Sequence, residues 1–353
     1  MGSSQPHRVP PSSFFSGHLR GAGDAFDGLV GKSRPMRQAV QKARQLCKGR
    51  SPVLLQGETG VGKELFARAI HESGCGGGAF VAVNCGGLPR DLLASELLGY
   101  VGGAFTGARP GGMVGKIEAA HRGTLFLDEI GEMPLDLQPY LLRVLEGGEI
   151  YPLGSVTARA VQFRLIAACN RDLRDEVSAG RFRADVFYRV SVTSLLIPAL
   201  RDRSEDIPAL VAHFSGIVVE HQQVPLRQFA PEVLTAFDGY SWPGNLRELR
   251  NVVEAMMLLG EGDVIGADAL PPPLADARIR PLSPPEERRH AGLQGVERDA
   301  IGAAIRTCRG NLMRAASDLR ISKSTLYLKL KKYGLETILD EARSARPRKP
   351  RSS

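Results

Sequence analysis

A glycine-rich segment between an apolar run and an amphipathic pattern constrains this 353-residue chain more than any other feature. The segment reads GETGVGKE and covers Gly57–Glu64, after the apolar run Val53–Leu55 and before apolar residues at helical spacing in Leu65–Ile70. A strand, a glycine loop and a helix in this order bring backbone N–H groups and the positive end of the helix to one point, where Lys63 reaches the outer phosphates of a nucleotide. The sequence therefore predicts a phosphate-binding loop; the alternative is a strand-to-helix turn that binds nothing.

The residues that we expect to hold the nucleotide are consecutive. They are Gly57, Glu58, Thr59, Gly60, Val61, Gly62, Lys63 and Glu64. In the general form of this motif the last position is Ser or Thr, whose hydroxyl binds magnesium. Glu64 occupies that position here, so the loop departs from the general pattern.

Four apolar runs alternate with helical patterns through the first half of the chain. The expected strands are Val53–Leu55, Phe80–Val83, Leu125–Leu127 and Phe163–Ala168. Such alternation predicts an α/β fold with a largely parallel sheet covered by helices. Apolar residues at core spacing between Leu137 and Leu145 predict one of those helices, and residues 198–270 predict a small helical subdomain.

Composition and charge exclude several classes of protein. The chain has 43% apolar and 24% charged residues and no apolar run long enough to cross a bilayer or to form a secretion signal, so we expect a cytoplasmic protein. Its five cysteines are scattered without CxxC spacing, which argues against both a disulfide framework and a zinc site. The net charge of +8 favours an anionic partner.

An acidic pair and three arginines are the remaining candidates for chemistry at the loop. Asp128 and Glu129 end an apolar run, where the first acid would hold magnesium and the second would polarise water for attack on the terminal phosphate. Arg183, Arg189 and Arg247 would supply positive charge in the transition state. Taken alone, the acids also fit a turn or a helix cap, and the arginines also fit surface ion pairs.

Four longer segments carry a specific resemblance. They are ELLGYVGGAFTGA (Glu96–Ala108), GTLFLDEIGEMPLDLQPYLLRVLE (Gly123–Glu146), FRADVFYRVSV (Phe182–Val192) and YSWPGNLRELRNVVE (Tyr240–Glu254). In this order they closely resemble the AAA+ domain of bacterial enhancer-binding proteins, the activators of sigma-54 RNA polymerase. The resemblance implies an ATPase with ATP and Mg²⁺ as its cofactors.

The resemblance also implies a role for each candidate. Glu64 is the usual residue in this family, Asp128 binds magnesium, and Glu129 is the catalytic glutamate. Asn84 matches the asparagine that restrains this glutamate, Asn170 matches the sensor I position, and Arg247 matches the sensor II arginine. Arg183 and Arg189 match arginine fingers that reach the nucleotide of a neighbouring subunit, which implies a homo-oligomeric, usually hexameric ring.

The segment GAFTGA is the most diagnostic part of the resemblance. It consists of Gly103, Ala104, Phe105, Thr106, Gly107 and Ala108. In the family this loop contacts the sigma factor, with Phe105 and Thr106 at its tip.

The C-terminal part predicts a helix-turn-helix. Leu312, Ala315, Ala316 and Leu319 have helical spacing, and a second helix carries Leu326 and Leu330. Residues 291–335 hold nine Lys or Arg against three acids, which favours DNA over the alternative of a dimerisation module. The segment resembles the Fis-type DNA-binding domain. The expected base contacts are Ser322, Lys323, Ser324 and Thr325, and the expected phosphate contacts are Lys329 and Lys332.

These features predict six regions. They are a flexible arm at 1–25, the AAA+ α/β subdomain at 26–195, its helical lid at 196–270, a proline-rich linker at 271–290, the Fis-type domain at 291–335 and a basic tail at 336–353.

The predicted function is an ATP-hydrolysing activator. It would bind upstream double-stranded DNA and remodel the sigma-54 RNA polymerase holoenzyme from a closed to an open promoter complex. No sensory domain fits before the ATPase, so control is expected from expression level or from a regulator acting in trans. One rival is a DNA-binding regulator whose nucleotide site is only a sensor or structural, and another is a general AAA+ loader or unfoldase.

Overall fold

A computed structural model describes residues 24–74, 78–277, 301, 304–305, 308, 311–319 and 323–333. The chain divides into two compact units, Met1–Arg280 and Pro281–Ser353. Each unit has its own hydrophobic core. Among the described residues, no helix is both long and apolar enough to cross a membrane.

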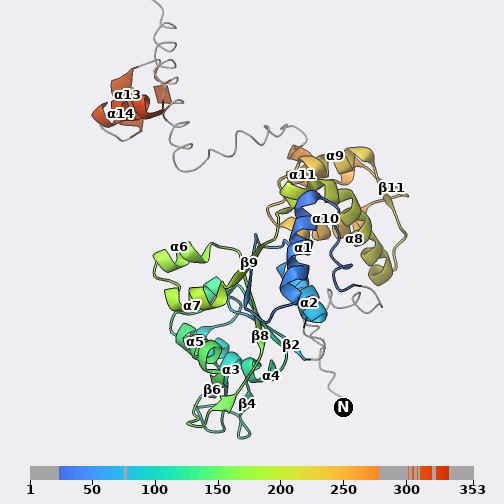
Figure 1. Ribbon diagram of the computed structural model, residues 1–353. Coiled ribbons are helices and arrows are strands. Elements are labelled where there is room, and N and C mark those ends of the chain that lie inside the picture. Colours follow the sequence, from blue (N-terminus) through green and yellow to red (C-terminus); the bar gives the residue numbers. More distant parts are fainter. Residues whose placement is uncertain are drawn as a thin grey trace, which may run out of the picture. The chain divides into compact units, whose positions relative to one another are not determined.

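A five-stranded parallel sheet forms the centre of the larger unit (Figure 1). Its strands in spatial order are β2 (Phe80–Asn84), β5 (Thr124–Asp128), β8 (Arg164–Cys169), β1 (Val53–Gln56) and β9 (Thr193–Leu196). All four pairings are parallel. The predicted α/β fold with a parallel sheet is therefore confirmed, and the carboxyl ends of all five strands lie at one edge.

Alternate side chains of the strands enter two separate cores because successive residues of a strand face opposite sides of the sheet. Val53 and Leu55 pack with α1 (Arg34–Cys47) and α2 (Lys63–Gly74), whereas Leu54 packs into the core on the opposite face. The helices whose buried residues join that second core are α3 (Arg90–Leu98), α4 (Lys116–Ala119), α5 (Gln138–Gly147), α6 (Leu173–Ser178) and α7 (Ala184–Val190). The sheet is thus the middle of three layers.

Two short hairpins extend from the layer that contains α3 to α7. One pairs β3 (Gly99–Tyr100) with β4 (Met113–Val114), and the other pairs β6 (Glu149–Ile150) with β7 (Arg159–Ala160). A parallel bridge between Tyr100 and Leu153 joins the two hairpins.

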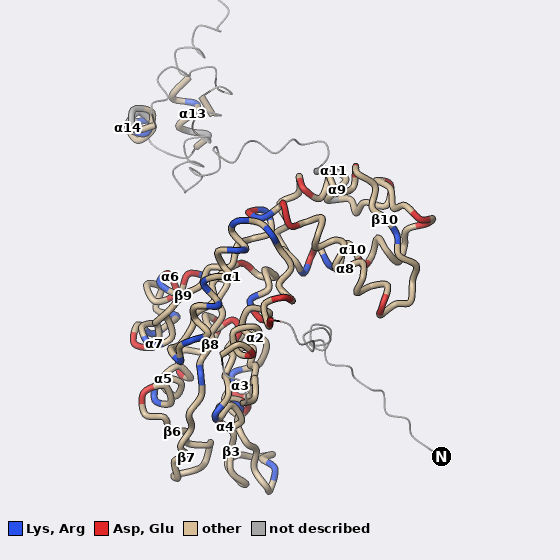
Figure 2. Tube along the Cα trace, turned by 45° about the vertical axis from the view of Figure 1, so that its right-hand side comes forward, with Lys and Arg blue, Asp and Glu red and all other residues tan. Residues whose placement is uncertain are grey.

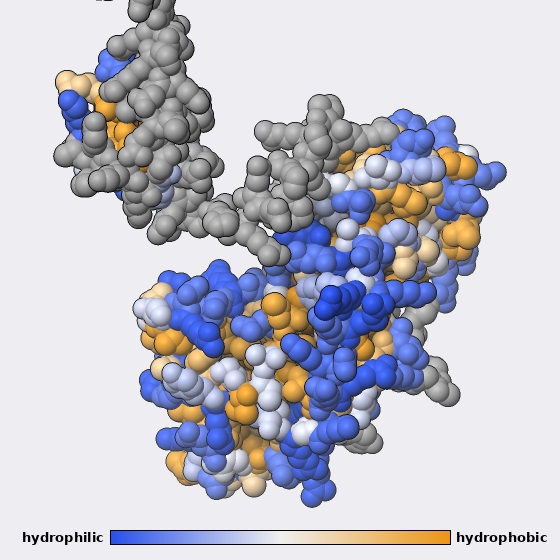
Figure 3. Space-filling view, turned by 45° about the horizontal axis from the view of Figure 1, so that its top comes forward, coloured by the Kyte–Doolittle hydropathy of each residue, from blue (hydrophilic) through white to orange (hydrophobic). Residues whose placement is uncertain are grey.

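A helical subdomain follows β9. Its elements are η3 (Leu200–Asp206), α8 (Ile207–Gln222), β10 (Gln228–Phe229), α9 (Pro231–Gly239), α10 (Asn245–Leu259), β11 (Val264–Ile265), η4 (Ala267–Ala269) and α11 (Pro272–Ala277). Trp242 is fully buried in its core and donates its indole N–H to the carbonyl of Phe237 at 2.7 Å. In the space-filling view, hydrophilic side chains run across the middle of the larger unit, with apolar ones on either side (Figure 3).

The smaller unit contains α13 (Leu312–Asp318) and α14 (Lys323–Tyr333). Leu312, Ala315, Ala316, Leu326 and Leu330 are buried together, so the predicted core of the two helices is confirmed.

Sequence analysis did not predict the fifth strand, β9, or the two-residue strands. Only Leu195 of β9 is buried, because β9 lies at the edge of the sheet. The four predicted strands are present within one residue of their expected starts.

Candidate functional site

The glycine-rich loop connects β1 to α2, as its flanking sequence predicts. The φ angles of Gly57, Gly60 and Gly62 are +154°, +80° and +101°, which side-chain-bearing residues rarely adopt. Lys63 begins α2 and its Nζ donates to the carbonyls of Gly57 at 2.9 Å and Glu58 at 3.0 Å. The lysine therefore lies inside the curve of the loop.

Three consecutive carbonyls of the loop are bonded to the helical subdomain. The carbonyl of Thr59 accepts from Asn245 Nδ2 at 3.0 Å, that of Gly60 from the Leu246 N–H at 3.0 Å, and that of Val61 from Arg203 Nη2 at 3.1 Å. A planar trans peptide directs its N–H opposite to its C=O. The N–H groups that follow these carbonyls therefore point away from the subdomain contacts, as a phosphate-binding loop requires.

The close approach of the two subdomains also requires glycine. A Cβ at Gly60 would overlap the carbonyl oxygen of Gly244, and a Cβ at Gly57 would lie 2.9 Å from the carbonyl oxygen of Ile197. Neither oxygen belongs to a flexible side chain, so backbone would have to move to admit either Cβ.

The acidic pair lies beside the loop at the end of β5. The Asp128 carboxylate accepts the N–H of Glu129 at 3.0 Å. Burial raises the pKa of Asp128, while the charge of Lys63 opposes this shift; burial likewise lowers the pKa of Lys63, and Asp128 opposes it. The two groups thus offset each other's desolvation in a site that disfavours isolated charge.

Glu129 has a left-handed backbone conformation, with φ 52° and ψ 43°. Such a conformation costs a residue with a side chain about 1–2 kcal/mol and tends to occur at functional positions. It directs the chain sharply away from β5 directly after Asp128.

The donor set suits magnesium. Among the described residues, no cluster of three or more His, Cys, Asp or Glu side chains is arranged to hold a metal by itself. Mg²⁺ at a nucleotide usually takes one or two carboxylates and completes its shell with phosphate and water. Asp128 fits the role of the single protein ligand.

The two predicted asparagines lie at the ends of the two strands that flank β5. Asn170 follows β8, and its Nδ2 donates to the Thr59 hydroxyl of the loop at 3.2 Å. Asn84 ends β2 opposite Asp128, and its Oδ1 accepts the N–H groups of Gly86 and Gly87, each at 2.8 Å. Its predicted restraint of Glu129 stays a prediction, because the contacts described for its side chain all lie within its own turn.

Glu58 connects the loop to the helical subdomain by side-chain contacts that sequence analysis missed. Arg201 binds its carboxylate through two bonds of 2.8 and 2.5 Å, and Asn245 Nδ2 donates to it at 3.1 Å. The hydrogen bond from Arg201 is the main reason that the pKa of Glu58 lies below its usual value. Asn245 is fully buried with φ 52°, and its Oδ1 accepts the Leu200 N–H. The clearest sequence signal for these contacts is a pair of arginines, Arg201 and Arg203, a few residues after β9 ends.

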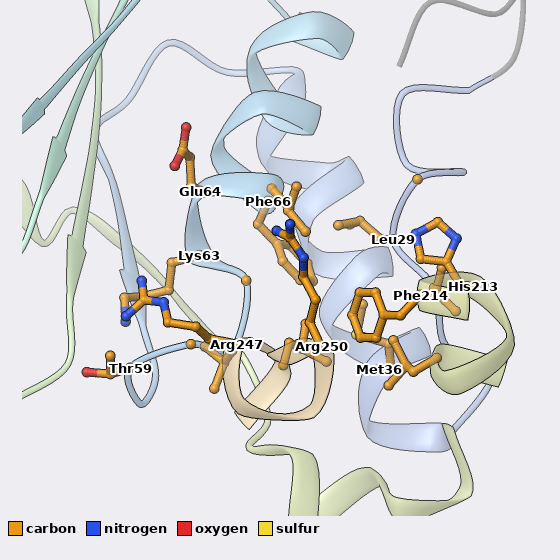
Figure 4. Close-up of a pocket in the computed structure, with 18 of the residues that line it drawn as sticks. Leu29, Met36, Thr59, Lys63, Glu64, Phe66, His213, Phe214, Arg247 and Arg250 are labelled. Atoms are coloured by element: carbon orange, nitrogen blue, oxygen red, sulfur yellow. The ribbon is translucent and has the colours of Figure 1, made fainter. Parts of the chain in front are cut away.

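A cavity of about 200 Å³ opens between the loop and the helical subdomain (Figure 4). Thr59, Lys63 and Arg247 gather at one end, and Leu29, Met36, His213 and Phe214 lie at the other. Asp128, Glu129, Glu64 and Arg250 also line the cavity. One end suits phosphates and the other suits a flat apolar ring, a combination that fits a nucleoside triphosphate. The apolar wall was not predicted, because its residues come from an N-terminal loop, α1 and α8.

Arg183 and Arg189 lie outside the lining of this cavity. Arg183 is exposed and pairs with Asp185 at 2.8 Å, and Arg189 donates to the Leu145 carbonyl at 2.8 Å. Both side chains are exposed, and their predicted reach into another subunit stays a prediction.

The GAFTGA segment spans the turn between β3 and β4. Gly103 and Gly107 have φ values of +78° and +91°, and no atom lies within 4 Å of a Cβ built on either. Phe105 is 47% exposed and contacts Tyr100 edge to face at 5.0 Å, while Thr106 is exposed. The predicted tip residues are therefore accessible.

Three of the expected base contacts, Lys323, Ser324 and Thr325, begin α14, and the expected phosphate contacts Lys329 and Lys332 lie in its second half. Lys323 is its exposed first residue, and Thr325 and Lys329 are half-buried. Ser324 and Lys332 also belong to α14, whereas Ser322 lies outside the described residues.

Comparisons with known proteins agree with this architecture. Residues 29–196 match the sigma-54 interaction domain, residues 201–284 the AAA+ ATPase lid domain, and residues 293–333 the bacterial regulatory protein, Fis family. The chain is 40% identical over 313 residues to regulatory protein LuxO of Vibrio parahaemolyticus, covering 86% of this chain and 69% of LuxO. It is 41% identical to UacR of Escherichia coli K12, named as a uric acid sigma-54-dependent transcriptional regulator, covering 88% of this chain and 54% of UacR.

A solved structure shares the fold. NtrX from Brucella abortus in complex with ADP has a TM-score of 0.66 and 34% sequence identity, covering 86% of this chain and 69% of NtrX. Another curated relative, a signal-transduction and transcriptional-control protein of Clostridium beijerinckii, is matched over only 49% of its own length. The chain thus spans about half to two thirds of the length of these relatives, and it belongs to the family of sigma-54-dependent transcriptional regulators, with an AAA+ ATPase-type domain and a Fis-type helix-turn-helix domain.

Proposed function

We propose that this chain hydrolyses ATP and uses the hydrolysis to remodel the sigma-54 RNA polymerase holoenzyme from a closed to an open promoter complex. The observation that carries the proposal is the cavity in which the phosphate loop, Asp128 and Glu129 meet an apolar wall. ATPase-family relatives, and an NtrX structure with ATP, support a nucleotide in this cavity.

In the proposed reaction, the N–H groups of the loop and Lys63 bind the phosphates, and the apolar wall holds the base. Asp128 would hold magnesium, which when bound neutralises phosphate charge. The Glu129 carboxylate would orient and polarise a water molecule in line with the terminal phosphate, and water attack gives ADP and phosphate. The left-handed backbone of Glu129 supports this role, because strained conformations of this kind occur most often at active sites.

Arg183 and Arg189 are proposed to complete the site of a neighbouring subunit in a homo-oligomeric ring, a hexamer by family resemblance. Their surface position and their separation from the cavity of their own chain support this assignment. The hydrogen bond from Asn170 to Thr59 and the place of Arg247 in the lining support their proposed roles as nucleotide sensors. Asn84 is proposed to restrain Glu129.

The Phe105–Thr106 tip is proposed to contact the sigma factor. Gly103 and Gly107 leave space around the tip, so it can change position without repacking a core. The Fis-type domain would bind upstream double-stranded DNA, and the chain would act in the cytoplasm.

Transcription in vitro from a sigma-54 promoter, measured beside ATP hydrolysis, tests the proposal. Lys63→Ala and Glu129→Gln should abolish both activities and leave DNA binding intact, whereas Thr106→Ala should retain hydrolysis and lose transcription. Full promoter opening by Glu129→Gln with no hydrolysis would favour the rival, a regulator that uses its nucleotide site only as a sensor. Full promoter opening by Thr106→Ala would remove the sigma-factor role from the tip.

A further inference from the structure

The charge of the larger unit is divided very unevenly along the chain. Residues 51–277 hold 19 Lys and Arg against 28 Asp and Glu, a net charge of −9. The preceding residues 32–50 hold seven Lys and Arg and no acid, a net charge of +7. This short segment thus has a charge opposite in sign to that of residues 51–277.

Most of this segment is helix α1, whose side chains separate cleanly into two faces. Met36, Ala39 and Ala43 are buried against the sheet and α2. All the charged side chains of the helix are exposed, namely Arg34, Arg37, Lys42 and Arg44, and Lys48 and Arg50 follow directly. The other exposed polar side chains are glutamines, at positions 38, 41 and 45. The Lys and Arg colouring accordingly recurs along α1 (Figure 2).

Little of this positive charge is neutralised within the unit. Asp24 pairs with Arg44 at 2.5 Å, and Arg37 donates to the Lys32 carbonyl. The carboxylate of Asp206 is engaged by the N–H groups of Lys32 and Ser33. No ion pair involves Arg34, Lys42 or Lys48 among the residues that the structure describes.

A helix of 14 residues is about 21 Å long. Over that length a DNA duplex carries about twelve phosphate charges, so a row of exposed Lys and Arg can meet several of them. Glutamine side chains between them can donate to phosphate or sugar oxygens without adding negative charge. Since the same chain carries a Fis-type domain, duplex DNA is the polyanion that it meets.

We propose that the exposed face of α1 is a second, sequence-independent contact for double-stranded DNA, separate from the helix-turn-helix domain. It binds the phosphate backbone through Arg34, Arg37, Lys42 and Lys48. The contact goes beyond the proposed ATPase function and does not depend on it. The contact holds the ATPase unit against DNA without adding a preference for any base sequence.

Two other occupants fit the charge less well. A membrane-binding helix inserts an apolar face between lipids, but the apolar face of α1 is committed to the core of the unit. A second copy of the chain offers a net charge of −9 spread over residues 51–277, whereas a duplex offers about twelve phosphate charges over the length of α1 alone. Both remain distinguishable outcomes of the test.

The test measures how the affinity of the full chain for a labelled duplex of arbitrary sequence depends on salt, and it compares the wild type with two variants. The variant Arg34→Gln, Lys42→Gln, Lys48→Gln removes three charges that make no ion pair, and glutamine already occupies neighbouring exposed positions of α1. The control Arg90→Gln, Arg159→Gln, Arg174→Gln removes three exposed charges from three other elements. Net charge therefore changes equally in both proteins, and the helix-turn-helix domain is untouched in both.

Each lost phosphate contact should lower the slope of log K against log salt by about 0.9. The α1 variant should thus lose about 2.7 from the slope, so that between 50 and 200 mM salt its affinity falls roughly 40-fold less than that of the wild type. The control should keep the wild-type slope, as should Arg34→Lys, Arg37→Lys, which preserves charge. Thermal unfolding checks that each variant is folded.

Equal slopes for the α1 variant and the control would overturn the proposal. Sedimentation velocity and binding to phosphatidylserine vesicles are measured in parallel. A variant that loses self-association or vesicle binding while keeping the wild-type slope on DNA would likewise overturn it, and would assign the face to a second copy or to lipid.

Discussion

The molecule contains two glycine-rich loops that use glycine for different physical reasons. In the phosphate loop, Gly57 and Gly60 are needed because backbone oxygens of Ile197 and Gly244 occupy the space of a side chain. In the GAFTGA segment, Gly103 and Gly107 face open space, and only their positive φ favours glycine.

The same contrast extends to hydrogen bonding. Carbonyls from Thr59 to Val61 are each bonded to a residue of the helical subdomain, so a change in the loop must move that subdomain. The bonds described within 103–108 are local turns, such as that from the Ala108 N–H to the Phe105 carbonyl. The first loop is therefore built to couple two bodies, and the second is built to move with little resistance.

The largest effect should come from adding one methyl group to the coupled loop. Gly60→Ala places a Cβ on the Gly244 carbonyl, which forces the loop and the helical subdomain apart. Because small displacements of a catalytic site cost about 100-fold, we expect ATP hydrolysis to fall by about that factor. Gly107→Ala is the matched control, and it should hydrolyse ATP within about twofold of the wild type, since its strain of about 1–2 kcal/mol is confined to an exposed turn. Similar hydrolysis rates for the two variants would remove the distinction between the loops.

The next largest effect should follow the loss of a buried amide. Asn245→Ala removes bonds to Glu58, the Thr59 carbonyl and the Leu200 N–H, and it leaves alanine at φ 52°. We expect the free energy of unfolding to fall by about 2–4 kcal/mol, from unsatisfied groups and backbone strain together. Urea denaturation measures the loss, and Asn245→Gly separates its causes, because glycine removes the bonds without the strain. Equal stability of the two variants would show that strain contributes nothing.

A smaller effect is expected from the exposed pair that also joins the loop to the subdomain. Glu58→Gln breaks a pair with Arg201 in which both side chains are about 40% exposed, so solvent screening limits the pair to about 0.5–1 kcal/mol. We expect the KM for ATP to rise about two- to fivefold with kcat little changed. Arg201→Gln should give the same rise, and the double variant should add little to it.

The pH dependence of this pair has a definite sign. The pKa of Glu58 is lowered in the folded state, chiefly by the hydrogen bond from Arg201. Its contribution is therefore complete above the usual pKa of 4.5 and is lost as the pH falls through the lowered value. Unfolding measured across acidic pH should show a difference between wild type and Glu58→Gln that shrinks as pH falls. A difference that grew on acidification would contradict this assignment.

The sequence was sufficient for parts of the site that are local in the chain. The loop, the acidic pair after β5 and the asparagine after β8 each follow an apolar run, and parallel strands bring their carboxyl ends to one edge. Sequence patterns did not identify Arg201 or Asn245, because their function depends on contacts across about 140 and 190 positions of the chain. They also did not identify β9, whose edge position leaves only Leu195 buried.

The smallest effect should come from the tip of the uncoupled loop. Phe105 is nearly half exposed and its described ring contact is with Tyr100, so Phe105→Ala should lower the free energy of unfolding by less than about 1 kcal/mol. Tyr100→Ala is the matched substitution in the same aromatic pair, but it removes a buried ring at the base of the hairpin and should cost about 3–5 kcal/mol. Thermal and urea unfolding of both variants measure the difference, and ATP hydrolysis by Phe105→Ala should stay at the wild-type rate. A stability loss at Phe105 as large as that at Tyr100 would mean that the tip is packed as firmly as the base of the hairpin. Moving the tip would then cost free energy, despite the open space around Gly103 and Gly107.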